Sequence, residues 1–233
     1  MSSTVFMKML VQMLRSSGST LLLFFLTLLI ALPLGLLVAN GRMSRHRWLN
    51  WPVRAYLLIM RGTPLMLQLI FFWFAPSLLV SALGVDARTI QANIVASFFL
   101  NNRMTAAVVA FSLNYAAYFA EIYRGGIESV PMGQREAADV LGFSKRQTFF
   151  HIVLPQVMKK ILPPMGNEFM TLVKDTALAS TIGVAELFVL AKETTSTQAT
   201  LLPIVVAGVF YLIMNALVSK GFSVAEKKLS YYR

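Results

Sequence analysis

The chain contains no cysteine, and only 13% of its 233 residues are charged. The absence of cysteine excludes a disulfide framework, a thiolate metal site and a cysteine nucleophile. The shortage of charge excludes an ordinary soluble domain, in which about 25% of the residues are charged. Apolar residues make up 57% of the chain instead, and the mean hydropathy is +0.66. The composition therefore predicts a protein whose main solvent is the lipid bilayer.

The chain also lacks the motifs of several enzyme classes. It has no G-x-x-x-x-G-K-[ST] phosphate loop, so it cannot bind and hydrolyse ATP in that way, and any such energy must come from a partner. Its two histidines, His46 and His151, belong to no H-E-x-x-H zinc motif, and there is no nucleophile elbow. We expect no enzyme activity, no metal and no cofactor bound by this chain. A membrane-embedded hydrolase lacks candidate residues.

Long apolar stretches recur along the whole sequence, and about five are long enough to span hydrocarbon as helices. They predict an all-α, polytopic membrane protein with residues 1–233 forming a single transmembrane domain. Proline and glycine are expected to break the second stretch at Gly62-Thr63-Pro64 and the fourth, unusually polar one at Pro163-Pro164. The predicted spans are Gly18 to Asn40, Val53 to Leu83, Met104 to Tyr123, Ile152 to Thr176 and Leu201 to Ser219.

The first 17 residues mix apolar side chains with Lys8 and Arg15. This pattern is typical of a helix lying in the headgroup plane. A disordered start is the alternative.

The distribution of basic residues predicts the orientation of the chain in the membrane. The formal net charge is +11, from 21 Lys and Arg against 10 Asp and Glu, and basic residues concentrate on cytoplasmic loops. With the N-terminus outside, five spans place most of these basic residues on the inner side. We therefore predict an external N-terminus and a cytoplasmic C-terminus. No nucleic-acid partner is needed, because no basic stripe with interleaved aromatics remains.

A cytoplasmic segment, residues 124–151, is long for a loop of a small membrane protein. Pro131 suits the first turn of a short helix that ends near Leu141, and Gly142 can close that helix in the left-handed conformation. Ser144 and Gln147 have the spacing of a capping box for a second helix. The segment therefore predicts a compact helix–turn–helix in the cytosol.

The same loop resembles a known family. Glu136-Ala137-Ala138, Gly142 and Ile152-Val153-Leu154-Pro155 fit the pattern E-A-A-x3-G-x9-I-x-L-P, which is the EAA loop of the membrane subunits of bacterial ABC importers. Other segments are similar to the polar amino acid subgroup of that family: Arg61-Gly62-Thr63-Pro64-Leu65, residues 120–127 and residues 172–180.

The resemblance implies a type I ABC importer permease fold in the bacterial cytoplasmic (inner) membrane. It implies that the loop is a coupling helix for cytoplasmic ATP-binding subunits, which hydrolyse the ATP. An extracytoplasmic amino-acid-binding protein and a second permease copy or homologue complete the importer. The alternative is that Glu136 and Gly142 serve only the loop's own fold. The implied coupling residues are Glu136, Ala137, Ala138, Gly142, Leu154 and Pro155.

Polar residues at membrane depth are costly and by default mark a pathway or a pair. Asn114 lies about 15 Å along its helix from Arg124, and Glu168 lies about 20 Å along its helix from Pro155, so both fall near the middle of the bilayer. Interhelical hydrogen bonding is the rival role. For Glu121, near the inner boundary, we expect an ion pair with Arg124 or with a loop residue. The candidate substrate-path residues are Asn114, Asn167, Glu168, Lys174 and Asp175.

The sequence therefore predicts the membrane-spanning subunit of an ATP-driven, binding-protein-dependent amino acid importer. A stand-alone channel or secondary transporter for small polar solutes is the alternative. Five spans without an internal repeat fit inverted-repeat carriers poorly, and neither alternative needs the EAA loop.

Overall fold

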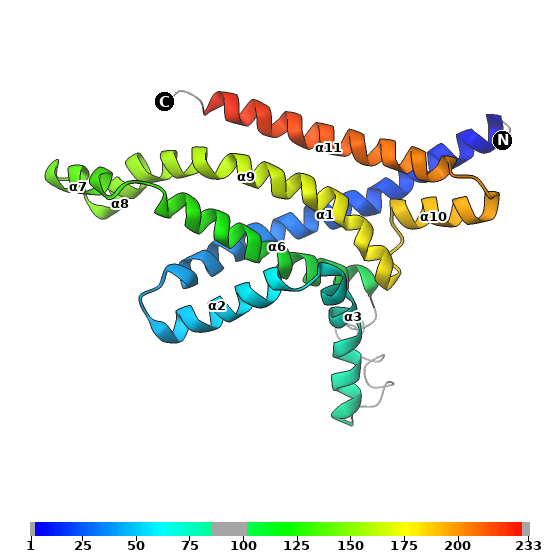
Figure 1. Cartoon of the computed structure of the whole chain (residues 1–233), viewed down its shortest axis with the longest axis horizontal. Coiled ribbons are helices and arrows are strands. Elements are labelled where there is room, and N and C mark those ends of the chain that lie inside the picture. The colour runs from blue at the N-terminus through cyan, green and yellow to red at the C-terminus, as the bar shows by residue number, and fades with distance from the viewer. Residues whose placement is uncertain (1–2, 85–101, 230–233) are drawn as a thin grey trace.

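The computed structural model describes residues 3–84 and 102–229, and within them every regular element is a helix (Figure 1). The predicted all-α class is confirmed. The element η1 is a π-helical turn and η2 is a 3-10 helix. In chain order the elements are α1 (Ser3–Met43), α2 (Arg47–Gly62), α3 (Leu65–Ala82), α6 (Arg103–Glu128), α7 (Met132–Val140), α8 (Lys145–Gln147), η1 (Thr148–Val153), α9 (Leu154–Asp175), η2 (Thr176–Ile182), α10 (Leu187–Gln198) and α11 (Leu202–Lys228).

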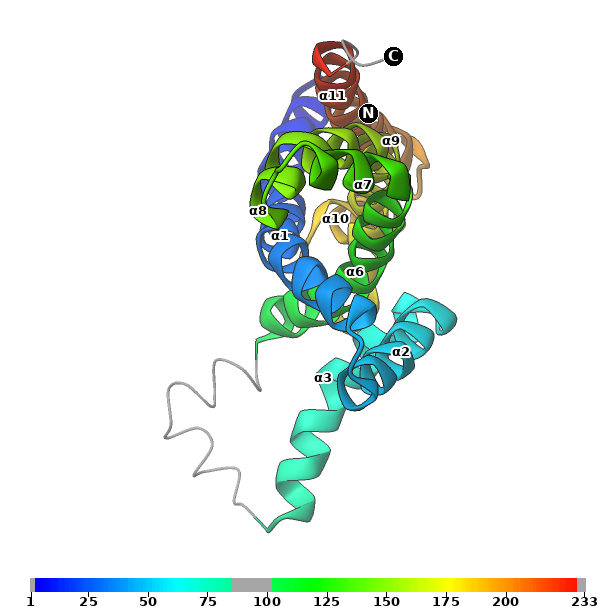
Figure 2. The same ribbon diagram turned by 90° about the vertical axis from the view of Figure 1, so that its left-hand side faces the viewer.

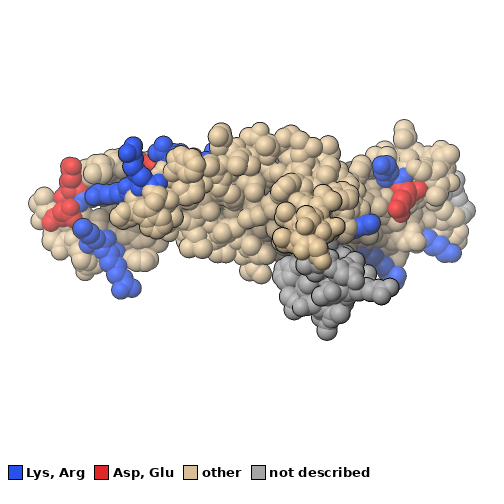
Figure 3. Space-filling model, turned by 90° about the horizontal axis from the view of Figure 1, so that it is seen from below, with Lys and Arg blue, Asp and Glu red and all other residues tan. Residues whose placement is uncertain are grey.

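The helices α1, α6, α9 and α11 run along the long axis of the molecule (Figure 1). α7 and α8 lie at one end of this axis, whereas α10 and the N-terminus lie at the other. Figure 3 shows charged side chains gathered towards both ends of the visible face, with a band between them that is almost free of charge. In the described part of the chain, α1, α3, α6 and α11 are long and apolar enough to cross a membrane.

The polar fourth stretch forms α9, a helix of 22 residues and therefore about 33 Å long. α9 packs against α6 and α11, so it crosses the apolar band in spite of its composition. The predicted break at Pro163-Pro164 is wrong, because α9 continues through both prolines. Proline is tolerated inside membrane helices where neighbouring helices and side chains supply partners for the freed backbone groups.

α6 lies at the centre of the core. Its side chains Phe111, Tyr115 and Phe119 are at most 2% exposed, and α1 packs along it. A Cβ added to Gly35 of α1 would lie 2.9 Å from Cβ of Phe119. The two helices are therefore closer at this point than any residue larger than glycine allows.

The N-terminal residues differ from the expectation. From Ser3 onward they form the first turns of α1, continuous with the predicted span Gly18 to Asn40. They do not form a separate helix in the headgroup plane. The reason is tertiary packing, because Met9 and Met13 are buried against α10 and α11. At 41 residues α1 is about 60 Å long, which exceeds the ~30 Å hydrocarbon core, so the helix has length to spare for this contact beyond the part needed to span.

The predicted break in the second stretch is confirmed. α2 ends at Gly62, and α3 begins at Leu65 after Pro64. Beyond the break α3 points away from the other helices (Figures 1 and 2). Only 11% of its most apolar window is buried inside the molecule.

Candidate coupling and transport sites

The end of the molecule formed by α7 and α8 has the predicted helix–turn–helix geometry. Gly142 has φ = +79°, and its N–H donates to the Asp139 carbonyl at 3.1 Å while the Phe143 N–H donates to the Ala138 carbonyl at 3.0 Å. These two bonds make a Schellman motif, in which glycine is preferred because its φ is positive. Ser144 and Gln147 form the predicted capping box at the start of α8.

α7 presents an apolar surface at the tip of the molecule. Val140 is 88% exposed and Leu141 is 73% exposed. Ala137 is exposed too, whereas Ala138 is buried. Exposed apolar side chains outside the lipid-facing band are typical of a protein contact site.

The remaining predicted coupling residues lie in α7 itself and at the start of α9. Glu136 is exposed and lines a cavity between α7 and the neighbouring ends of α1 and α6. Leu154 and Pro155 begin α9 directly after η1, and α7 packs on η1. α7 therefore rests on a turn that continues into α9.

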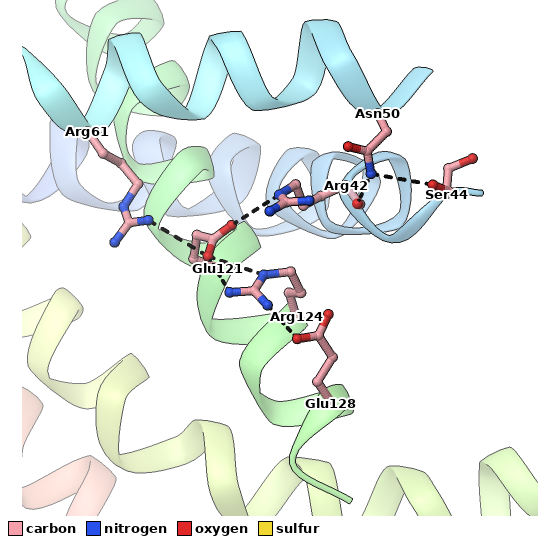
Figure 4. Close-up of polar contacts among 7 residues, drawn as sticks. All are labelled: Arg42, Ser44, Asn50, Arg61, Glu121, Arg124 and Glu128. Atoms are coloured by element: carbon pink, nitrogen blue, oxygen red, sulfur yellow. Dashed lines mark hydrogen bonds and ion pairs between the residues drawn. The ribbon is translucent and has the colours of Figure 1, made fainter. Parts of the chain in front are cut away.

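A cluster of ion pairs joins α1, α2 and α6 (Figure 4). Glu121 lies 2.7 Å from Nη2 of Arg124, 3.8 Å from Nη1 of Arg61 and 4.0 Å from Nε of Arg42. Arg124 also pairs with Glu128. The expected pair between Glu121 and Arg124 is confirmed, and two further arginines share the same carboxylate. A carboxylate shared by several cations holds the helices that carry them together.

A cavity of about 370 Å³ opens beside this cluster, between α2, α6 and α9. Its size lies in the range of small-molecule sites, about 300–1,000 Å³. The guanidinium of Arg61 lies 5.4 Å from the centre of the Tyr118 ring, and Nζ of Lys160 donates to the Ser129 carbonyl at 2.6 Å. The cavity therefore offers both signs of charge in an otherwise apolar region. The charged side chains that line it are Arg61, Glu121, Lys160 and Glu168.

The substrate-path candidates are not gathered at one place. Glu168 lines the cavity just described, while Asn167 and Lys174 are exposed on α9. Asp175 accepts a hydrogen bond of 2.8 Å from the Tyr115 hydroxyl, which ties the end of α9 to α6. Asn114 is 4% exposed and is not among the residues that line the cavity.

Asn114 instead binds the break between α2 and α3. Its side-chain amide donates to the Met60 carbonyl and to Oε1 of Gln68, both at 2.9 Å. Gln68 in turn donates to the Met60 carbonyl at 3.0 Å and to Oγ1 of Thr63 at 2.8 Å. The last carbonyls of a helix have no partner within it, and these two amides supply one.

Sequence reasoning missed Glu186, which is 1% exposed. It caps α10 by accepting bonds from the N–H groups of Phe188 and Val189, at 2.8 and 2.9 Å, and it accepts another at 2.8 Å from the Tyr211 hydroxyl of α11. Burial raises the pKa of this carboxyl above its ordinary value of 4.5, and these hydrogen bonds oppose the rise. The sequence did offer a signal for a buried acidic group, because Glu186 is the lone acidic residue between Asp175 and Glu193.

Comparison with known proteins agrees with this architecture. Residues 31–230 match the family described as "Binding-protein-dependent transport system inner membrane component". The L-cystine transport system permease protein of Bacillus subtilis is 37% identical over 216 residues, which are 91% of this chain and 84% of that protein. The arginine ABC transporter permease protein of Escherichia coli is 34% identical over 210 residues, which are 87% and 88% of the two chains.

Solved structures show the same fold. A crystal structure of an amino acid ABC transporter with histidines has a chain that is 30% identical, with a TM-score of 0.81 over 98% of this chain and 99% of that one. An inward-facing methionine ABC transporter superposes with a TM-score of 0.71 at 18% identity, over 99% of this chain and 100% of that one. The helices described above are therefore those of the type I importer permease fold. The chain belongs to the family of binding-protein-dependent transport system inner membrane components, and it is a multi-pass permease subunit of an ABC importer.

Proposed function

We propose that this chain is the membrane-spanning subunit of an amino acid importer that is driven by partner ATPase subunits and supplied by an extracytoplasmic binding protein. The observation that carries this proposal is the exposed α7 tip, closed by Gly142, in a permease whose relatives include cystine and arginine permeases. A stand-alone channel or secondary transporter has no use for such a tip. The whole chain, residues 1–233, is proposed to act as one transmembrane domain.

The residues 124–151 are proposed to form the coupling loop. The exposed face of α7, with Val140 and Leu141, contacts the ATPase in this proposal, and Glu136 pairs with a basic residue of that partner. Ala137 and Ala138 allow close approach. Leu154 and Pro155 pass the displacement of α7 into α9 through η1.

The substrate path is proposed to follow the α9 face that carries Asn167, Glu168 and Lys174. Glu168 faces Arg61 across the cavity lining, and an amino acid zwitterion needs one anionic and one cationic partner. Asn114 and Asp175 serve this path indirectly, since each holds a helix end by hydrogen bonds. Glu168→Gln is then expected to change which amino acids stimulate uptake while basal ATP hydrolysis and assembly stay intact.

The orientation is proposed to be N-terminus outside and C-terminus cytoplasmic. Lys and Arg residues occur near α7 and α8 and in the last turn of α11. The proposal places both regions on the cytoplasmic side, where basic residues concentrate. A reporter fused after Arg233 is expected to be cytoplasmic, and one inserted at Lys192 in α10 is expected to be external. A cytoplasmic signal from Lys192 contradicts this orientation.

A second permease copy or a homologue is proposed to complete the translocation path. The support is α3, which projects from the molecule with Phe71, Phe74 and Leu78 more than half exposed. Exposed apolar side chains such as these can contact lipid as well as a second permease, so the association itself must be measured. Two differently tagged copies of this chain are co-expressed with the candidate partner permease, and purification by one tag reveals which copy is retained.

The function is tested by reconstitution in liposomes with the ATPase and binding protein, using a panel of radiolabelled amino acids. We expect uptake that requires ATP, the binding protein and the intact α7 tip. Uptake by this chain alone, driven by an ion gradient, contradicts the proposal and supports a secondary transporter.

A further inference from the structure

A second cavity, of about 860 Å³, lies between α7 and the ends of α1, α6 and η1. Its lining has an apolar part and a charged part. Leu36, Met43, Ile127 and Phe149 supply apolar walls. The charged lining residues are Arg45, Arg135, Glu136, Asp139 and Lys145.

These charged side chains do not neutralise one another. The ion pairs recorded among the described residues all involve Glu121 or Glu128 in the cluster of Figure 4. Nε of Arg135 is moreover buried without a hydrogen-bond partner. A buried N–H that has no acceptor is costly, so this guanidinium is suited to an acceptor supplied from outside the chain. Arg135 is the partly buried member of this set, whereas the other four charged side chains are exposed. The cavity therefore presents both signs of charge around one unpartnered N–H, which suits a ligand that carries both a negative and a positive charge.

The apolar part reaches into the membrane-crossing part of α1. Leu36 precedes Met43 by seven residues on the same face of the helix, so it lies about 10 Å further along the axis. Leu36 is 48% exposed and Phe149 is 38% exposed. A water-soluble partner cannot follow α1 to that depth, whereas an acyl chain already lies there.

We propose that this cavity binds a phospholipid whose headgroup combines a phosphate with a primary ammonium, that is, a phosphatidylethanolamine. The phosphate accepts hydrogen bonds from Nε of Arg135 and from the cations of Arg45 and Lys145. The ammonium donates to the carboxylate of Asp139, which also lines the cavity. One acyl chain lies against Leu36 and Met43, so the lipid connects α7 to α1.

The proposal goes beyond the transport function, and it can be tested on the purified full chain in detergent by native mass spectrometry. The probes are short-chain phosphatidylethanolamine, phosphatidylglycerol and phosphatidylcholine. We expect the ethanolamine lipid to bind most tightly, because the glycerol lipid has no ammonium and the choline lipid has no N–H donors. Arg135→Gln is expected to weaken its binding by about tenfold or more, as loss of a charged hydrogen bond does.

Matched variants separate this site from general charge effects. Arg146→Gln removes a neighbouring charge that does not line the cavity and is expected to leave lipid binding unchanged. Asp139→Asn is expected to weaken the ethanolamine lipid more than the glycerol lipid. Arg45→Gln lies outside α7 and repeats the test if Arg135→Gln fails to fold. Glu136 is left intact, so loss of lipid binding is distinguishable from loss of coupling.

Three results would overturn the proposal. One is equal binding of the ethanolamine lipid by the wild type and by both arginine variants. Another is binding of soluble phosphoethanolamine as tight as that of the lipid, which indicates a site for a free phosphate compound. The last is loss of ATPase association in Arg135→Gln with unchanged lipid binding, which assigns the cavity to the ATPase.

Discussion

Gly142 closes α7 in a conformation that a side chain opposes, so its replacement tests the coupling role of the loop. Its φ of +79° lies in the left-handed region, which costs an L-residue about 1–2 kcal/mol. A Cβ added there meets no atom within 4 Å, so the cost comes from the backbone alone. We expect Gly142→Ala to destabilise the closed end of α7 by about 1–2 kcal/mol. Gly142→Val is expected to cost more, since β-branched residues avoid this region.

A loss of this size matters because α7 has only nine residues, and isolated helices shorter than about 12 residues are marginal in water. It lowers the ratio of closed to open α7 ends by a factor of about 5–30. ATP-driven uptake into liposomes and retention of the ATPase subunits on the tagged permease are expected to fall with it, while membrane insertion continues. Gly133→Ala is the control, because Gly133 lies inside α7 without a positive φ. Wild-type uptake by Gly142→Val refutes the reasoning.

Further predictions concern groups that hold the helices together. Glu121→Gln removes the carboxylate shared by arginines of α1, α2 and α6 and is expected to lower the free energy of unfolding by about 1.5–3 kcal/mol. Glu128→Gln, at a side chain that is 54% exposed, is expected to lower it by less than about 1 kcal/mol. Thermal unfolding of the two variants in detergent measures the difference. Asn114→Ala removes the donor to Oε1 of Gln68 and one of the two side-chain donors to the Met60 carbonyl. A loss of about 1–2 kcal/mol is therefore expected with an unaltered amino acid preference in the uptake assay, whereas a changed preference assigns Asn114 to substrate contact. Burial raises the pKa of Glu186 above 4.5, so the stability it contributes is present below pH 4.5 and is lost as pH rises through the raised pKa. The thermal midpoint of the wild type is therefore expected to fall relative to that of Glu186→Gln as pH increases, and parallel midpoints contradict this.

The coupling loop was predictable because its signals are local. A left-handed glycine and a capping box each act within a few residues, and both are found in the structure at Gly142 and Ser144. Pro131, expected in the first turn, lies one position earlier as the N-cap of α7. The break at Gly62-Thr63-Pro64 was predictable for the same reason. Apolar stretches of spanning length likewise located α1, α6 and α11.

Features that depend on packing were not predictable. Two prolines in sequence indicate a break, yet α9 continues through Pro163-Pro164 between its neighbours. The pattern of residues 1–17 predicts a separate interfacial helix, but Met9 and Met13 pack against α10 and α11, and the segment continues α1. Helical rise predicts that Asn114 lies near the middle of the bilayer, but it gives no information on which way the side chain points or on its bonds to Met60 and Gln68.

The position of η1 suggests how a movement of α7 reaches the cavity that Glu168 lines. α7 packs on η1, and η1 runs without interruption into α9. α9 then carries Lys160, Pro164 and Glu168 along the cavity. On the opposite wall, Arg61 is held by Glu121, whose other partners lie on α1 and α6. A displacement of α7 relative to the Glu121 cluster must therefore change the distance between Glu168 and Arg61, because one side chain moves with α9 while the other is tied to the cluster. A short thiol-to-thiol crosslink between cysteines introduced at Gly125 of α6 and Pro164 of α9, which both line this cavity and leave Arg61 and Glu121 in place, is expected to form in one nucleotide state of the assembled importer and not in the other. Equal crosslinking in both states contradicts this route.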